Sequence, residues 1–416
     1  MKSIGLKIIN IQISETGILE DTLINCLAGL QMKMVELNIR VEQILKITIF
    51  FQPGLTQEFI QQRTKIQEKY KTFFHGEYPC FSLITDFPET DHAISLEVFV
   101  FTNTFDYILE RKSFNDIRYS VLNGNGKKEI FVAGITLKDY EEKEVEISDH
   151  IEYVFSISRQ ILIREGLDFN NIVRNWNYLE NITGTYQKGL KTFQNYQVFN
   201  DIRSGYFNLC NFENGYPAST GIGMAKGGIV AEFIAVSPKK DLHIKPLKNS
   251  LQTDAFSYTS DVLIGHPLPK MSRVSTPKFE RAKLIKEDTD RVLFISGTAS
   301  IIKEKTIAPE SVIEQTNLII ELISSLRKIE TIEIFNELYS NEFYFKVYVK
   351  KREHLPIVKA ICVNKWGNEN CQFLIADICR TDLLVEIECV TISFLSDKNE
   401  SVTEISENGV NNEILH

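Results

Sequence analysis

A short stretch near the C-terminus combines residue types that could transfer a proton. Glu386 and Glu388 alternate with apolar residues in the segment Leu383-Leu-Val-Glu-Ile-Glu388. Burial in such a strand would cost a carboxyl group its hydration, raise its pKa and keep its proton near neutral pH, as a general acid requires. Alternation also places both glutamates on one face of the strand, which could equally be the solvated face. The segment thus indicates a candidate acid, Glu386, in one of two environments.

Cys379 and Arg380 lie shortly before these glutamates. A thiol next to a guanidinium group could ionise in part to a thiolate, which would be a usable nucleophile or base. The alternative is a structural cysteine that a core strand buries. The sequence leaves both interpretations open.

The composition excludes several classes of partner. The chain has 416 residues, 43% of them hydrophobic, and a formal net charge of -9. This length predicts several packed units, and an acidic surface would gain nothing from a nucleic acid or an anionic membrane. An anionic ligand would need a local basic pocket. The chain shows no signal peptide, no apolar run near the roughly 18 residues of a membrane span, and no CxxC pair among seven cysteines, which predicts a cytoplasmic protein.

Two stretches of the chain repeat one order of elements. Residues 30–100 show the patterns of a strand, an amphipathic helix and two further strands, and residues 311–390 show the same kind of succession. The sequence therefore predicts an α+β fold of duplicated units, each a mixed sheet covered by helices on one face, with a middle α+β segment. Such a chain could form an intramolecular pseudo-trimer as a monomer, or assemble as a homotrimer.

We expect four parts along the chain. They are a divergent N-terminal copy over 1–150, a middle α+β segment over 151–290, a catalytic C-terminal copy over 291–395 and a disordered acidic tail over 396–416. A long helix is expected over 190–210, and the charged run 138–146 is expected to be a solvated face or a loop.

Common catalytic motifs are missing from the chain, which has no P-loop, no HExxH and no GxSxG. The glycine-rich stretch 221–228 superficially resembles a nucleotide-binding loop. It follows no clear strand and opens no helix, so we interpret it as a turn between packed strands.

Six short strings in one order resemble the chorismatase family, whose fold is built on α+β units of the RidA/YjgF type. They are Arg174-Asn-Trp-Asn-Tyr178, Tyr196-Gln-Val-Phe-Asn-Asp-Ile-Arg203, Tyr216-Pro-Ala-Ser-Thr-Gly-Ile-Gly223, Pro277-Lys-Phe-Glu-Arg-Ala282, Leu293-Phe-Ile-Ser-Gly-Thr-Ala-Ser300, and Ile375-Ala-Asp-Ile-Cys-Arg380 with Leu383-Leu-Val-Glu-Ile-Glu388. The resemblance implies an enzyme that converts chorismate to pyruvate and a cyclic carboxylic acid, here 3-hydroxybenzoate, without a metal or organic cofactor.

The resemblance also implies catalytic roles for two residues. Glu386 corresponds to the general acid that protonates the methylene carbon of the enolpyruvyl group. Cys379 corresponds to a cysteine associated with displacement within the ring and aromatisation, in the branch that resembles 3-hydroxybenzoate synthases. The choice of product depends mainly on Cys379.

The two carboxylates of chorismate require cations in the pocket. The candidate residues for binding these carboxylates are Arg203, Arg281, Lys350 and Arg380. Tyr258 is a candidate hydroxyl donor, and Ala299 is a candidate for the pocket wall that sets the position of the ring. The chain departs from the family at Lys350, where an arginine is expected, and Lys351 or Arg352 could take its place. A second departure is Lys303-Glu-Lys-Thr306, where the family usually reads Gly-His-Glu-Ser.

Three alternatives accompany this prediction. A chorismatase could release a dihydroxycyclohexadiene carboxylate instead of an aromatic product. The departures at 303–306 and Lys350 would also suit a non-catalytic RidA-like subunit of an aromatic secondary-metabolite or pigment pathway. A third possibility is imine hydrolysis of the RidA type, with Arg380 holding the substrate carboxylate.

Overall fold

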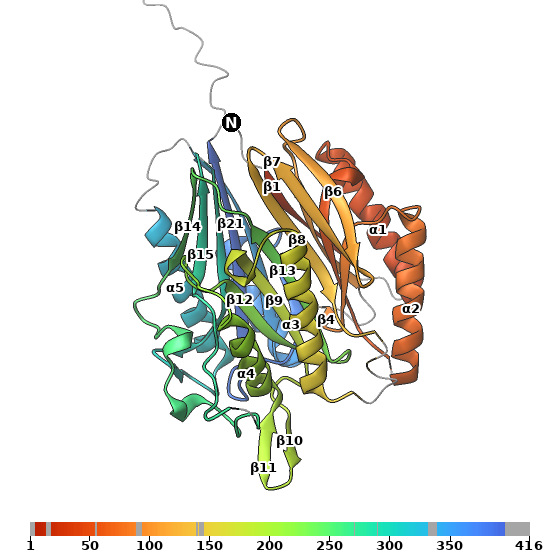
Figure 1. Ribbon diagram of the computed structural model, residues 1–416. Coiled ribbons are helices and arrows are strands. Elements are labelled where there is room, and N and C mark those ends of the chain that lie inside the picture. Colours follow the sequence, from red (N-terminus) through yellow and green to blue (C-terminus); the bar gives the residue numbers. More distant parts are fainter. Residues whose placement is uncertain are drawn as a thin grey trace, which may run out of the picture.

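The computed structural model describes residues 5–13, 18–54, 56–88, 94–138, 140, 145–269, 271–288, 290–331 and 339–395. These residues form three mixed sheets with helices at the periphery (Figure 1). Each sheet contains a core of four strands from a continuous part of the chain. We call the three parts the first, second and third unit.

The three units share one order of elements, in which a strand, a helix, a strand, a helix and two strands follow one another. The first unit comprises β1 (Leu6–Ile13), α1 (Leu19–Glu36), β2 (Ile44–Phe51), α2 (Thr56–Phe73), β3 (Cys80–Ile84) and β5 (Ile94–Phe101). In the second unit the same order is β8 (Lys127–Ile135), α3 (Ile147–Arg164), β9 (Ile172–Glu180), α4 (Asn195–Phe207), β12 (Ala218–Met224) and β13 (Ile229–Val236). In the third it is β16 (Asp290–Ala299), α5 (Val312–Thr331), β19 (Tyr339–Val349), α6 (Leu355–Trp366), β20 (Cys371–Ile375) and β21 (Val385–Leu395).

The pairing of strands repeats as well. The core orders are β1-β5-β2-β3, β8-β13-β9-β12 and β16-β21-β19-β20. Additional strands extend the second sheet with β6 (Tyr107–Phe114) and β7 (Ile117–Gly124), and the third with β14 (Leu242–Leu247), β15 (Ala282–Glu287) and β4 (Phe87–Pro88). Two small hairpins complete the fold: β10 (Thr185–Lys188) with β11 (Lys191–Gln194), and β17 (Ile301–Ile302) with β18 (Lys305–Thr306).

Each sheet has one face toward its own helices and one face toward the other two sheets. In β21, Val385, Ile387 and Cys389 pack with α5 and α6, whereas the intervening Glu386 and Glu388 point to the interior. Three local cores lie between sheets and helices, and a fourth core contains side chains of all three units, such as Phe50, Trp176 and Tyr348. The units therefore surround a common centre.

A layer of alternating charges crosses this common centre, and we call it the central charge layer. It links the units because Lys46 contacts Glu97 at 3.2 Å and Glu232 at 2.6 Å, while Lys346 contacts Glu97 at 2.6 Å. Lys346 and Arg174 also contact Glu388 of β21, at 3.1 and 2.7 Å. Its six buried members are Lys46, Glu97, Arg174, Glu232, Lys346 and Glu388. Three cations balance three anions, as burial of charge requires.

The expected α+β class and the repeated units are confirmed, and the middle segment is itself a third copy of the unit. The sheets divide the chain differently from the boundaries expected at 150 and 290. Strands β6 and β7 join the second sheet, and strands β14 and β15 join the third, because hairpins connect β7 to β8 and β15 to β16. The acidic tail 396–416 and most of the charged run 138–146 lie outside the described residues.

Local predictions had mixed outcomes. Helix α4 is shorter than the helix expected over 190–210, since β11 occupies 191–194. Residues 221–224 belong to β12, and the turn to β13 is confined to 225–228, where Gly227 and Gly228 have positive φ. None of the described helices is long and apolar enough to cross a membrane.

Candidate active site

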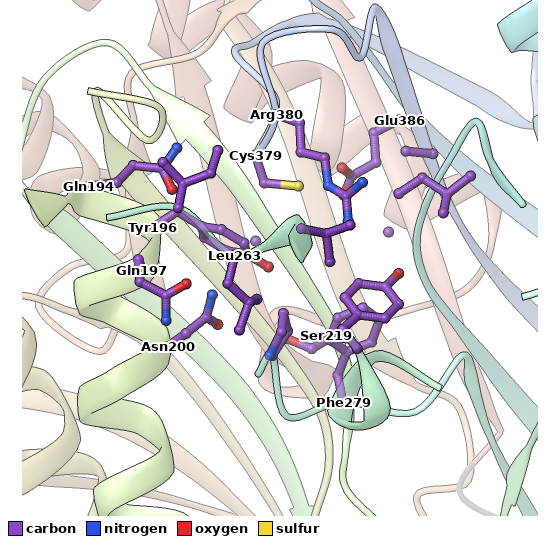
Figure 2. A pocket seen from close by; sticks show the side chains of 18 of the residues that line it. Gln194, Tyr196, Gln197, Asn200, Ser219, Leu263, Phe279, Cys379, Arg380 and Glu386 are labelled. Atoms are coloured by element: carbon purple, nitrogen blue, oxygen red, sulfur yellow. The ribbon is translucent and has the colours of Figure 1, made fainter. Parts of the chain in front are cut away.

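A pocket lies at the junction of the second and third units. Helix α4 and strand β12 form one side, and β16, β21 and the segment between β20 and β21 form the other. Figure 2 shows Gln197 and Asn200 of α4 across the pocket from Cys379, Arg380 and Glu386. The pocket has a volume of about 790 Å³, including its open mouth.

Residues that are distant in the sequence meet in this pocket. Seven of the residues that the sequence indicated line it, from both units and from the irregular segment between β14 and β15. They are Arg203, Tyr258, Arg281, Ala299, Cys379, Arg380 and Glu386.

Glu386 lies on the interior face of β21 and is 4% exposed. Burial and the nearby Glu388 carboxylate raise the pKa of Glu386 to about 8, against an opposing effect of Arg174. No described residue donates a hydrogen bond to its carboxyl group. Glu386 therefore lies on a buried face of the strand and not on a solvated one. With its pKa raised to about 8, its carboxyl group keeps its proton at neutral pH.

Glu388, two residues further along the same face, has the opposite protonation state. Burial would raise its pKa, but Lys346, Arg174, and hydrogen bonds from Thr220 and Trp176 lower the pKa of Glu388 to about 2. Trp176 donates to it at 2.8 Å and Arg174 at 2.7 Å. Two neighbouring carboxyl groups thus differ in charge because only one has cationic partners.

The chain leaves room for Glu386 by means of a glycine. Pairing between β16 and β21 shifts register between Ile295 and Thr298, and Gly297 lies in this bulge. A β-carbon at Gly297 would overlap the Glu386 carboxyl oxygen. The Gly297 amide donates to the Thr220 hydroxyl at 3.1 Å, which fixes the bulge against β12.

Two buried arginines line the pocket with unused hydrogen-bonding capacity. Arg203 donates to the Asn200 side chain at 2.5 Å, and Arg281 donates to the Tyr258 hydroxyl at 2.7 Å. The Nε atoms of both arginines are buried and have no hydrogen-bond partner in the described part of the chain. Burial lowers the pKa of Arg203 to about 10, so it is still charged at neutral pH. Buried donors without partners fit an anionic ligand.

The interpretation of Cys379 as a partial thiolate is wrong. Burial and the neighbouring Glu386 raise the pKa of the Cys379 thiol to about 12, and the opposing effect of Arg380 is smaller. Arg380 donates to the Glu304 carbonyl at 2.9 Å and lies 5.6 Å from the centre of the Tyr258 ring. The cysteine therefore presents a neutral S–H group to the pocket.

Lys350 does not line the pocket, so the prediction that it binds a substrate carboxylate is corrected. Its ammonium group contacts Asp377 at 2.9 Å and donates to the carbonyl groups of Arg380 and Thr381 at 3.3 and 3.2 Å. Its place at the end of β19 directs it to the segment that carries Cys379 and Arg380. Lys351 and Arg352 do not line the pocket either.

The second departure, 303–306, lies behind the pocket wall. Glu304 accepts hydrogen bonds from the Thr259 amide at 2.9 Å and the Thr259 hydroxyl at 2.8 Å, next to Tyr258. Together with its contact to Arg380, this makes the segment a support for two lining residues.

Several further residues line the pocket that the sequence did not indicate. Tyr196 and Asn200 share one face of α4 with Arg203, and this spacing could have indicated them. The apolar residues 262–264 belong to an irregular segment whose sequence has no periodic signal.

Comparisons with known proteins agree with this architecture. Residues 113–235 match the family model described as chorismatase FkbO/Hyg5-like, N-terminal. A 3-hydroxybenzoate synthase of Streptomyces hygroscopicus is 29% identical over 244 residues, which are 55% of this chain and 65% of the relative. A chorismatase of Streptomyces rapamycinicus is 28% identical over 54% of this chain and 65% of its own length. The chain thus spans just under two thirds of these curated relatives.

A chorismatase crystal structure has the same fold, with a TM-score of 0.64 and 19% identity over 94% of this chain and 99% of that one. The fold is therefore shared over nearly the whole chain, beyond the part in which sequence similarity is detectable. In sequence over about half of its length, and in fold over nearly all of it, the chain is similar to proteins of the chorismatase family.

Proposed function

We propose that this protein converts chorismate to 3-hydroxybenzoate and pyruvate. The observation that carries the proposal is Glu386, a buried carboxylic acid with a pKa raised to about 8 in a pocket lined by arginines. A proton donor beside anion-binding groups suits a substrate whose carboxylates are held while a carbon atom is protonated.

The arginines would bind the two carboxylates of chorismate from different sides. Arg203 belongs to the second unit and Arg380 to the third, whereas Arg281, with Tyr258, belongs to the irregular segment between β14 and β15. A guanidinium group offers two parallel donors and so fixes the orientation of a carboxylate as well as its position. Binding across the junction would hold the enolpyruvyl group against Glu386.

The reaction would begin with transfer of the Glu386 proton to the methylene carbon of the enolpyruvyl group. This forms a C–H bond and leaves an oxocarbenium ion at the ether carbon. In the aromatic branch, the neighbouring ring hydroxyl displaces the ether oxygen, which leaves as the carbonyl oxygen of pyruvate. Opening of the resulting epoxide and loss of a ring proton give 3-hydroxybenzoate. The products together contain the atoms of chorismic acid, so no water is consumed overall.

The aromatic product is supported by Cys379, whose neutral thiol lines the pocket beside Glu386. The similarity to a 3-hydroxybenzoate synthase agrees with it. In the alternative, water attacks the oxocarbenium carbon and a dihydroxycyclohexadiene carboxylate is released with pyruvate. Ala299, opposite Glu386 in the strand register, is the wall that would set the ring position in either case.

A non-catalytic role has less support in the geometry. Its basis was the departure from the family at Lys350 and at 303–306, and neither lines the pocket. The acid and the arginines are brought together in spite of both departures.

The test is incubation of the purified protein with chorismate. Pyruvate would be followed with a coupled dehydrogenase, and the ring product would be identified by chromatography and absorbance. We expect Glu386→Gln to reduce the rate by about 100- to 10,000-fold, the usual contribution of general acid catalysis. Glu310→Gln, the same change at an exposed position, is the control.

Cys379→Ala tests the choice of product. We expect the variant to release pyruvate together with a cyclohexadiene, because water would replace the ring hydroxyl as the attacking group. An unchanged aromatic product would show that Cys379 does not determine which product is formed. Absence of pyruvate from folded wild-type protein would contradict the proposed function itself.

A further inference from the structure

A second pocket lies at the junction of the first and second units. Helix α2 and strand β3 form one side, and β8 and β13 contribute to the other. The corresponding elements of the next two units, α4, β12, β16 and β21, form the candidate active site. The volumes are also similar, about 880 Å³ here and about 790 Å³ there, each including an open mouth. We call it the first-junction pocket.

The two junctions agree in detail. Pairing of β8 with β13 shifts register between Ala231 and Phe233, as pairing of β16 with β21 does between Ile295 and Thr298. Gly134 lies in the first bulge, and its amide donates to the Ser82 hydroxyl of β3 at 2.6 Å. In the second bulge, the Gly297 amide donates to the Thr220 hydroxyl of β12. In both junctions, a hydrogen bond from the bulge glycine to a hydroxyl group therefore joins the two units.

The register identifies the counterpart of the candidate acid. Ile135 pairs with Ala231, and Thr298 pairs with Ile387, each directly after its bulge glycine. The preceding residues on the partner strands are Val230 and Glu386, and each lines its own pocket. The alignment also matches Glu232 with Glu388, which both belong to the central charge layer. The first-junction pocket thus has valine in place of the acid.

Cations predominate in the described lining of this pocket. Asp116 is the one described acidic residue in the lining, and it pairs with Lys138 at 2.8 Å. The cationic lining residues are Arg63, Lys71, Arg118, Lys138 and Lys226. This excess of positive charge occurs in a chain with a net charge of -9. The cationic side chains in one cavity repel one another, and an anionic ligand would offset this repulsion.

Aromatic rings accompany these cations. Phe59, Tyr78 and Phe81 line the pocket, and the Arg118 guanidinium carbon lies 3.5 Å from the centre of the Tyr78 ring. Arg118 donates to the Tyr78 carbonyl at 3.2 Å and has no carboxylate partner among the described residues. Apolar rings and charged donors in one cavity suit a ligand that combines a ring with a carboxylate.

We propose that the first-junction pocket is a second binding site, which takes a small aromatic or cyclic carboxylate and holds it without reaction. The similar construction accounts for the class of ligand, and Val230 accounts for the lack of turnover. The class of ligand rests on the proposed function, whereas the second site itself rests on the lining of this pocket.

Titration calorimetry with 3-hydroxybenzoate as the probe tests this site. We expect two binding events per chain in the wild-type protein, one at each junction. The double variant Lys71→Gln, Arg118→Gln should weaken one of them by about tenfold or more and leave chorismate turnover unchanged. The matched control is Lys65→Gln, Lys69→Gln, which removes the same charge from α2 outside the pocket. Arg281→Gln should weaken the other event.

The outcomes separate the two proposals. A single event that is lost in Arg281→Gln and unaffected by the Lys71, Arg118 double variant would overturn the second site, as would no binding at millimolar probe. A single event that is lost only in the double variant would support the second site and count against the proposed function. Thermal unfolding of each variant would establish that the fold is intact.

Discussion

Glu386 and Glu388 point from the same face of β21 into the interior, yet their pKa values lie on opposite sides of neutrality. The pKa is raised to about 8 at Glu386 and lowered to about 2 at Glu388. Glu388 is ionised because the central charge layer surrounds it with Lys346 and Arg174, and its charge in turn opposes ionisation of Glu386. The contacts that join the units therefore also keep the candidate acid protonated.

This relationship predicts a pH profile for turnover. A general acid acts in its protonated form, so the rate should be constant below the pKa of Glu386 and fall as the pH rises through about 8. The dependence of kcat/KM on pH between 6 and about 9.5 would show the descending limb, with the coupling enzyme assayed separately at each pH. A rate that stayed level to the upper end would exclude Glu386 as the acid.

Stability should depend on pH through the same group. The pKa of Glu386 is raised from an ordinary value of 4.5 to about 8, so the folded state keeps a proton that the unfolded chain releases. Its stabilising effect is complete below 4.5 and declines as the pH rises to about 8. Glu386→Gln, which cannot ionise, should therefore unfold several degrees above the wild type at pH 8 and gain less at pH 5. Calorimetric melting temperatures at the two pH values would check this, and an equal difference at both would contradict it.

Room for the acid depends on one glycine. A β-carbon at Gly297 would overlap the Glu386 carboxyl group, so Gly297→Ala should displace the acid and reduce kcat by about 100-fold or more. The control is Gly205→Ala on the exposed side of α4, where a β-carbon meets nothing and should stabilise the helix by about 0.5 to 1 kcal/mol. Comparison of the rates and melting temperatures of the two variants would show whether Gly297→Ala loses activity because Glu386 is displaced or because the protein unfolds. Full activity in Gly297→Ala would show that Glu386 can move without consequence.

The alternation around Glu386 could be predicted from the sequence, but the environment of that face could not. The face is buried because three sheets meet at it, and this meeting depends on contacts such as Lys346 with Glu97, far apart in the chain. The same holds for Lys350: the sequence identifies its charge, but it does not show that the side chain points toward Asp377. Helix α3 has no counterpart among the expected elements, although Ile151, Val154 and Ile161 mark its buried face.

The central charge layer should dominate the stability of the whole chain. Lys346 is fully buried between Glu97 of the first unit and Glu388 of the third, so Lys346→Met would leave each carboxylate with fewer partners in a dry interior. We expect a loss of about 3 to 5 kcal/mol in the free energy of unfolding, the range for removal of one member of a buried ion pair. Lys7→Met, the same substitution in a partly exposed pair between Lys7 and Glu342, should cost about 1 kcal/mol or less. Denaturant unfolding of both variants would give the comparison. A similar small cost at both sites would mean that packing of the shared apolar core, rather than the charges, holds the three units together.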